Sequence, residues 1–285
     1  MRDRHRQAKP RPQRPGAWRG SRPQTYRRER GAPAGDGPVI LYGWHTVTAA
    51  LANPARRIRR LLATENALRR LADEGVAPSV APELVRPDAI AARLSADAVH
   101  QGLLAEADPL PSPALEALGT GSRIVLVLDQ ITDPHNVGAI LRTAAAFSVA
   151  AVVTTARHSP EATGVLAKSA SGALEFVPIV TVQNLARALA ALKERGFLVV
   201  GLDSAGSDDL AALALAAPLA LVLGAEGKGL RQGTRANCDH LARLDLPGAI
   251  KSLNVSNAAA LALYVTSRAI AAASVPAAEP AGAAT

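Results

Sequence analysis

The second half of the chain alternates continuous apolar runs with segments of helical character. The runs cover residues 123–129, 149–155, 175–180, 197–203, 219–225 and 241–246. Strands covered on both faces are apolar along their whole length, whereas strands with one wet face alternate apolar and polar residues. We therefore predict an α/β fold with a parallel sheet that helices cover on both faces. The expected helices span 136–147, 164–169, 184–195, a short segment near Gln232, and 254–273.

A smaller α/β unit is predicted before this region, at residues 39–107. Apolar spacing predicts a helix over 41–53 that ends before Pro54, because proline cannot continue a helix. The other expected elements are strands at 57–64, 77–80 and 102–106 and helices at 66–73 and 87–94. A linker rich in Pro and Gly at 108–121 is expected to separate this unit from a second domain at 122–273.

The net charge of +8 is confined to the N-terminus. Residues 1–38 hold eleven Lys or Arg against three Asp or Glu, so the rest of the chain is neutral. Their six prolines and five glycines predict a disordered basic tail, and the Ala- and Pro-rich residues 274–285 predict a disordered C-terminal end. The single cysteine, Cys238, excludes a disulfide framework and a cysteine-rich metal site, and no apolar run reaches the ~20 residues of a membrane span. We expect a cytoplasmic protein with no metal and no membrane contact.

Ligands of open parallel sheets bind beyond the carboxyl ends of the strands, so the loops there are candidate sites. After the run at 123–129, Asn136 is expected to cap the next helix. The buried stripe of that helix leaves Arg142 on another flank, among Gly138, Ala139 and Ala146. Small neighbours would let a ligand or another backbone approach this arginine. The alternative is a solvated arginine on a capped helix.

The run at 219–225 leads into a turn that holds Gly224, Glu226, Gly227 and Gly229. Glycines permit a close approach of backbone and ligand. Two phosphate-binding templates fail, because Lys228 is not followed by Ser or Thr and Gly233 comes one residue late for G-x-G-x-x-G. A glutamate at the turn suits a hydroxyl or an amine. The alternative is a plain tight turn.

Beyond the run at 241–246, a Pro-Gly turn leads to four residues of the types that cap helices: Ser252, Asn254, Ser256 and Asn257. One of them must cap the helix, and the surplus predicts side-chain hydrogen bonds to a ligand or another loop. Lys251 either meets a phosphate or faces solvent.

These three stretches resemble the motifs of the SpoU (TrmH-like) family of RNA ribose 2′-O-methyltransferases. The family's first motif matches Asn136, Gly138 and Arg142, and its third, S-L-N-V-S, matches residues 252–256. Its second, G-x-E-x-x-G, matches Gly224, Glu226 and Gly229. The N-terminal unit resembles the small ribosomal-protein-like RNA-binding domain of the RlmB subgroup, which methylates a guanosine of large-subunit (23S) rRNA.

The resemblance implies a methyltransferase domain with a deep trefoil knot, S-adenosylmethionine as cofactor, and a homodimer whose active sites contain residues of both chains. The residues implied at the reacting centre are Asn136, Arg142, Glu226, Ser252 and Asn254. Those implied around the cofactor are Leu223, Gly224, Glu226, Gly227, Leu244, Leu246, Leu253 and Ser256. Because an arginine, with a pKa above about 12, gives up its proton only at high cost, we interpret Arg142 as a stabiliser of the developing alkoxide rather than a base.

The expected partner is 23S rRNA, free or in a ribosomal precursor. RNA contacts are predicted at Arg56, Arg57, Arg59, Arg60 and Lys251. The turn before the third motif is shorter than is usual in the RlmB type and more similar to the tRNA-methylating branch. A tRNA ribose methyltransferase is therefore one alternative, and a non-catalytic RNA-binding assembly factor is another.

Overall fold

A computed structural model of the chain describes residues 37–119, 121, 123–157 and 164–273. The predicted basic tail lies outside these residues except for Gly37 and Pro38, and so does the predicted C-terminal end. None of the helices in the described part of the chain is both long and apolar enough to cross a membrane.

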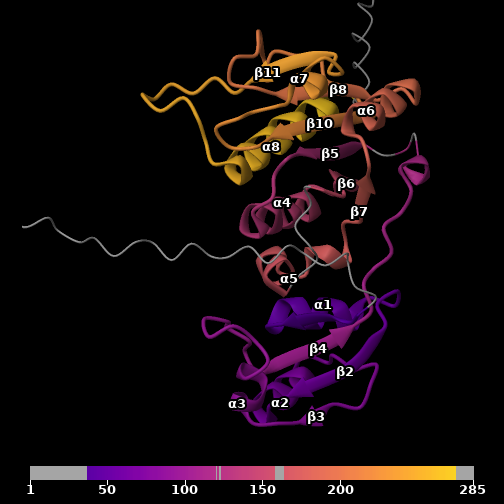
Figure 1. Ribbon diagram of the computed structural model, residues 1–285, viewed down its shortest axis with the longest axis vertical. Coiled ribbons are helices and arrows are strands. Elements are labelled where there is room, and N and C mark those ends of the chain that lie inside the picture. The colour runs from indigo at the N-terminus through magenta and orange to yellow at the C-terminus, as the bar shows by residue number, and fades with distance from the viewer. Residues whose placement is uncertain (1–36, 120, 122, 158–163, 274–285) are drawn as a thin grey trace, which may run out of the picture. The chain divides into compact units, whose positions relative to one another are not determined.

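Residues 39–107 form a four-stranded sheet with helices packed on it (Figure 1). Its strands are β1 (Val39–Tyr42), β2 (Ile58–Ala63), β3 (Glu83–Leu84) and β4 (Leu103–Ala107), in the order β1-β4-β2-β3. Strand β4 pairs antiparallel with β1 and β2, and β3 pairs parallel with β2. The helices are α1 (Trp44–Ala52), α2 (Glu65–Asp73) and α3 (Pro87–Ala91).

Two predictions for this region are wrong. The helix expected over 41–53 begins only at Trp44, because β1 occupies the preceding residues and Gly43, at φ 87°, breaks the chain direction between them. Residues 77–80 are not a strand, and β3 forms a few residues later beside β2. Apolar spacing alone does not separate β1 from α1, since β1 is as apolar as the helix that follows. Strand β3 has only two residues, which is too short to show a pattern.

The predicted parallel sheet is confirmed, and it has seven strands in the order β7-β6-β5-β10-β8-β11-β9. They are β5 (Ile124–Asp129), β6 (Ala151–Thr155), β7 (Ile179–Val182), β8 (Leu198–Leu202), β9 (Asp208–Asp209), β10 (Leu219–Gly224) and β11 (His240–Arg243). Each neighbouring pair is parallel. The two-residue strand β9 was not predicted, because it has no apolar run.

Helices cover both faces of this sheet. Along β5, Ile124, Leu126 and Leu128 pack into one apolar cluster and Val125 and Val127 into the other. The first cluster lies under α4 (Pro134–Ala146), α5 (Gly164–Ala170) and α8 (Val255–Ala273), and the second under α6 (Leu185–Glu194) (Figure 1). The short helices η1 (Leu115–Ala117), η2 (Ala173–Glu175) and α7 (Gln232–Arg235) complete the fold.

The order in which the chain adds strands changes direction at the centre of the sheet. After β5 the chain moves outward through β6 and β7, then crosses to β8 and returns to lay β10 between β5 and β8. The loops that leave β5 and β10 therefore diverge at the carboxyl edge. Such a point of divergence is where open α/β sheets bind ligands.

Gly138 serves packing rather than access to Arg142. A Cβ atom at this position would lie 2.3 Å from Cβ of Ser169 on α5, which is closer than real Cβ contacts. The small residue thus lets α4 and α5 approach each other. Of the two alternatives that the small residues suggested, a ligand or another backbone, Gly138 meets the backbone of α5.

Candidate active site

The loop after β5 turns sharply into α4. Gln130 has a left-handed φ of 61°, and Asp133 caps the helix, since its Oδ1 accepts a hydrogen bond of 3.1 Å from the backbone N–H of His135. The prediction that Asn136 is the cap is therefore wrong. Asn136 lies in the first turn of α4, and its side chain bonds outside that helix.

The turn after β10 needs glycine for a steric reason. A Cβ on Gly224 would lie 2.3 Å from the carbonyl carbon of Gly229, because the turn folds back onto the end of its own strand. The N–H of Gly229 donates a hydrogen bond of 2.8 Å to the carbonyl of Ala225, and Gly227 and Gly229 have φ values of 73° and 64°. The close approach that requires glycine at position 224 is thus an approach of the turn's own backbone. Glu226 stands exposed at its tip.

A long loop joins β11 to α8 and extends away from the sheet (Figure 1). Lys251 lies within it and donates a hydrogen bond of 2.6 Å from Nζ to the carbonyl of Leu246. The loop ends at Asn254, whose Oδ1 accepts from the N–H of Ser256 at 2.9 Å and from its hydroxyl at 2.6 Å. Asn254 is thus the member of the predicted set that caps α8.

Two hydrogen bonds bring the three sequence motifs together. Nδ2 of Asn254 donates to Oδ1 of Asn136 at 3.0 Å, which links the start of α8 to α4. The N–H of Val255 donates to Oε1 of Glu226 at 3.0 Å, which links α8 to the turn after β10. Residues that are up to 118 positions apart in the chain thereby meet at one point of the carboxyl edge.

A cleft of ≈ 400 Å³ opens at this meeting point. It is lined by Gln130, Ile131, Thr132, Asp133, Asn136, Ala225, Glu226, Lys228 and Val255. Sequence reasoning singled out only Asn136 and Glu226 of this set as site residues. The loop after β5 was missed because its members are ordinary polar residues, although the break in apolar pattern before Pro134 marks where it lies.

Several predicted site residues do not line this cleft. Arg142 is exposed on α4, six residues beyond Asn136 and hence ~9 Å further along the helix at the usual rise. The side chain of Leu223 is buried in the sheet. The other predicted residues outside the cleft are Gly224, Gly227, Leu244, Leu246, Ser252, Leu253, Asn254 and Ser256, all on its bordering loops or at the start of α8.

Cys238 has no sign of catalytic activation. Burial raises the pKa of its thiol from the usual 9.0 to about 11, and the thiol donates to the carbonyl of Thr234 at 3.3 Å. A catalytic cysteine needs a lowered pKa, because the thiolate is the nucleophile. In the described part of the chain, no group of three His, Cys, Asp or Glu side chains is arranged to hold a metal ion.

The predicted arginine patch is divided by the structure. Arg56 is only 7% exposed, pairs with Glu175 at 2.7 Å and donates to the carbonyl of Asp108 at 2.8 Å, so the prediction that it contacts RNA is wrong. Arg59 and Arg60 are partly exposed and pair with Asp108 and Glu83. Arg57 is the most accessible of the four, with 82% of its side chain exposed.

Comparison with protein families agrees with these motifs. The SpoU rRNA methylase family matches residues 123–264, and a family described as RNA 2′-O ribose methyltransferase substrate binding matches residues 40–113. A Pseudomonas aeruginosa protein named 23S rRNA (guanosine-2′-O-)-methyltransferase RlmB is 40% identical over 234 residues, which cover 79% of this chain and 94% of that protein. The chain belongs to the SpoU rRNA methylase family. The resemblance drawn from the three motifs is therefore confirmed.

Other relatives and solved structures of SpoU proteins agree. The protein of the same name from Pseudomonas putida is 38% identical over 238 residues, again 79% of this chain and 94% of that protein. The SpoU methyltransferase AviRb from Streptomyces viridochromogenes, solved in complex with AdoMet, has a TM-score of 0.69 at 23% identity and covers 81% of this chain and 90% of its own. A putative RNA methyltransferase of the TrmH family from Porphyromonas gingivalis has a TM-score of 0.69 at 27% identity, with the same two coverages. The SpoU fold is thus shared over both sheets.

Proposed function

We propose that this SpoU-family chain is an enzyme that transfers a methyl group from S-adenosylmethionine to the ribose 2′-OH of a guanosine in 23S rRNA. The observation that carries the proposal is the convergence of Asn136, Glu226 and Asn254 beside one cleft at the carboxyl edge of the sheet. The names of the related proteins support the choice of 23S rRNA over tRNA, since the match spans nearly their whole length.

The cleft and its surroundings fit the cofactor. Its volume of ≈ 400 Å³ lies in the range of about 300–1,000 Å³ that is typical of small-molecule sites. On the loop before α8, Ile250 is 77% exposed and Leu253 39% exposed. A bound ligand that removes such apolar side chains from water lowers the free energy of the complex. We place the cofactor at this cleft, between the loop before α8 and the turn after β10. Glu226 lines the cleft. The other residues proposed to border the cofactor lie on the elements around the cleft, and they are Leu223, Gly224, Gly227, Leu244, Leu246, Leu253 and Ser256.

The bound cofactor supplies an electrophilic methyl group on its sulfonium sulfur, so the chain has to orient the ribose hydroxyl and stabilise the charge that develops on its oxygen. One oxygen of Glu226 is occupied by the N–H of Val255, which leaves the other to accept from the ribose hydroxyl or to hold a guanidinium group. Asn254 occupies Oδ1 of Asn136, which leaves the amide hydrogens of Asn136 as donors toward the substrate. Ser252 adds a hydroxyl on the adjoining loop.

We propose that Arg142 acts in the cleft of a second copy of this chain. It lies on the exposed flank of α4, about 9 Å further along that helix than Asn136, and does not line the same cleft. The exposed apolar side chains Leu261 and Tyr264 on α8 are surface that a second copy could bury. In this homodimer the guanidinium of Arg142 would stabilise the alkoxide that develops on the ribose.

Further parts of the proposal concern the fold and the RNA. We propose that the segment from β10 to α8 forms a deep trefoil knot, because α8 begins against the turn after β10 although β11 lies between them in the chain. Residues 39–107 would act as the ribosomal-protein-like RNA-binding domain, with Arg57, Arg59 and Arg60 meeting phosphates, and Lys251 would do so beside the cleft. An enzyme of this kind would act in the cytoplasm, where rRNA is processed.

The decisive test is transfer of labelled methyl groups to unmodified 23S rRNA and to unmodified tRNA, followed by mapping of the modified nucleotide. We expect a 2′-O-methylguanosine in 23S rRNA and no label in tRNA. Label in tRNA alone would contradict the rRNA assignment. An absence of transfer together with no calorimetric binding of S-adenosylmethionine would instead indicate a non-catalytic RNA-binding protein.

A further inference from the structure

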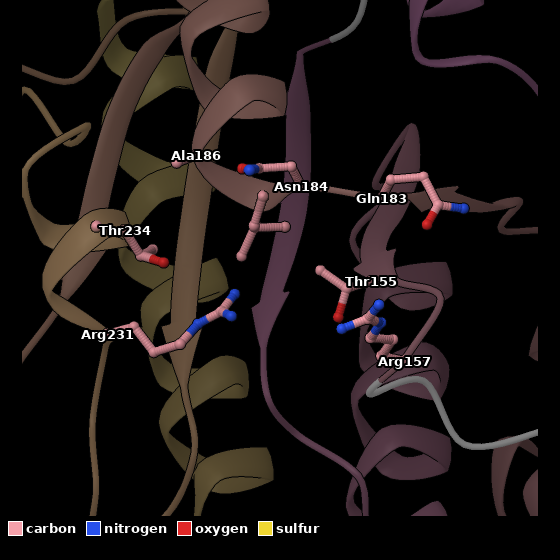
Figure 2. Close-up of a pocket in the computed structure, with 9 residues that line it drawn as sticks. Thr155, Arg157, Gln183, Asn184, Ala186, Arg231 and Thr234 are labelled. Carbon is pink, nitrogen blue, oxygen red and sulfur yellow. The ribbon is translucent and has the colours of Figure 1, made fainter.

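A second pocket opens at the same edge of the parallel sheet, on the face that α6 covers (Figure 2). It has a volume of ≈ 590 Å³ and lies where β6 and β7 end and α6 begins. Its polar lining consists chiefly of Thr155, Arg157, Gln183, Asn184, Arg231 and Thr234. None of these residues lines the cleft assigned to the cofactor.

Thr155 has an unused hydroxyl at this pocket. The residue is only 4% exposed, and its Oγ1 has no hydrogen-bond partner within the described part of the chain. Figure 2 shows this oxygen on the side of the Arg157 guanidinium. Buried polar groups in native proteins are nearly always paired, and an exception points to a missing ligand or water.

Arg231 is held rigidly at the opposite wall. Its backbone N–H and its Nε donate to the buried carboxylate of Asp129 at 2.9 and 2.6 Å. The rest of its guanidinium points across the pocket toward Arg157 (Figure 2). Asp129 offsets one of these two positive charges, and among the described residues no acidic side chain lines the pocket, so the described lining carries one net positive charge.

The start of α6 contributes further donors. The side chain of Asn184 caps this ten-residue helix by accepting from the N–H of Arg187 at 3.1 Å. The N–H groups of Leu185 and Ala186 lie in the first turn, where an α-helix offers no internal acceptor. Both residues line the pocket. The pocket therefore combines a helix N-terminus, two guanidinium groups and a buried hydroxyl.

We propose that this pocket binds a backbone phosphate of the RNA substrate, beside the nucleotide that is methylated. A phosphate offers only acceptor oxygens and negative charge, which this lining of donors complements. The ion pair of Arg231 with Asp129 joins the turn after β10 to the end of β5, and these same two loops border the cofactor cleft. The inference rests on the proposed function in that the substrate is an RNA, and it adds where the neighbouring part of that strand is held.

The test compares binding of an unmodified 23S rRNA transcript to the full-length protein and its variants over a range of salt concentrations. Thr155→Val removes the hydroxyl at nearly constant volume, and Arg157→Gln removes a charge without disturbing Asp129. Ser267→Ala is the control for the first, because Ser267 on α8 carries another buried hydroxyl that has no partner among the described residues. Arg123→Gln is the control for the second, because Arg123 precedes β5 at the opposite edge of the sheet.

Arg157→Gln should weaken RNA binding about tenfold and lower the slope of log K against log salt by about 0.7–0.9. Thr155→Val should weaken RNA binding without lowering Tm, since it removes an unpaired buried polar group. Both controls should bind RNA as the wild type does, and S-adenosylmethionine affinity should be unchanged in all four. Wild-type RNA affinity in both pocket variants would overturn the proposal.

Inorganic phosphate tests whether the ligand of this pocket is RNA or a free anion. If phosphate raises Tm of the wild type but not of Arg157→Gln, while both bind RNA equally, the pocket takes a free anion and the RNA assignment is overturned. The RNA-binding measurement does not require methyl transfer. A failure of the proposed reaction is therefore distinguishable from a failure of this inference.

Discussion

Asn254, at the start of α8, donates a hydrogen bond of 3.0 Å to Asn136 on α4, although the two residues are 118 positions apart in the chain. The same asparagine caps α8 through its Oδ1. One side chain thus ends a loop, begins a helix and fixes the position of a second asparagine beside the cleft.

The two roles of Asn254 can be separated by substitution. Asn254→Ser keeps a side chain that caps helices well but is too short to reach Asn136, so we expect near-wild-type Tm and a loss of methyl transfer of about 10²-fold from misplacement. Asn254→Ala should lose activity and also about 0.5–2 kcal/mol of stability. Thermal unfolding and kcat/KM measure the two effects. Wild-type activity in the serine variant would show that the link to Asn136 is unimportant.

Arg142→Ala should abolish methyl transfer while the protein still folds and binds its cofactor. The loss of one donor to a developing oxyanion costs about 2.7–4 kcal/mol, or 10²–10³ in rate. Arg142→Lys should also fail, because an ammonium group does not reproduce the planar guanidinium fork.

Mixing Arg142→Ala with Glu226→Gln tests whether these residues act across two chains. A mixed dimer then contains one site with both residues intact, and activity should partly return. Mixtures as inactive as their components would place Arg142 and Glu226 in the same chain's site or outside it.

Gly224→Ala should destabilise the turn after β10 and weaken cofactor binding. Its Cβ would meet the backbone of Gly229 at 2.3 Å, and backbone cannot move aside as a flexible side chain can. Gly233→Ala is the matched control, since a Cβ there meets nothing within 4 Å. Calorimetric affinity for S-adenosylmethionine and Tm report both effects. Equal values for the two variants would contradict the steric argument.

Cys238 should react slowly with alkylating agents in the folded protein. Because burial raises its pKa from 9.0 to about 11, the thiolate fraction at pH 8 is about a hundredfold smaller than in the unfolded chain. The unfolded thiol loses its proton first, so the stability contributed by this group is complete below pH 9 and is lost as the pH rises toward 11. Alkylation rates and unfolding between pH 8 and 11 test this, and Cys238→Ser should remove the pH-dependent part.

Removal of residues 1–36 should leave the fold and cofactor affinity intact but weaken RNA binding. These residues hold eleven Lys or Arg against three acids, which accounts for the whole net charge of +8. If about four of the cations meet phosphates, the slope of log K against log salt should fall by roughly 3. Binding of 23S rRNA at several salt concentrations measures this. Equal slopes with and without the segment would leave RNA binding to surfaces such as Arg57.

Local patterns in the sequence determined the parallel sheet and most of its helices. A strand covered on both faces has no room for polar residues, so β5 and β10 are visible as unbroken apolar runs. Helix α6 begins within one residue of its expected start, because Asn184 is a cap that can be recognised from residue type. The motif residues Asn136, Glu226 and Asn254 were likewise visible in the sequence alone.

Only the tertiary structure decided which of these residues meet and which are taken up by other partners. Arg56 belongs to a run of arginines in the sequence, yet Glu175, 119 residues away, holds it in the interior. Thr155 ends one strand among many, and its pocket exists only because the starts of α6 and α7 converge on it. Such outcomes depend on contacts between distant segments, and no local spacing of residue types encodes the distance between two atoms that the fold brings together.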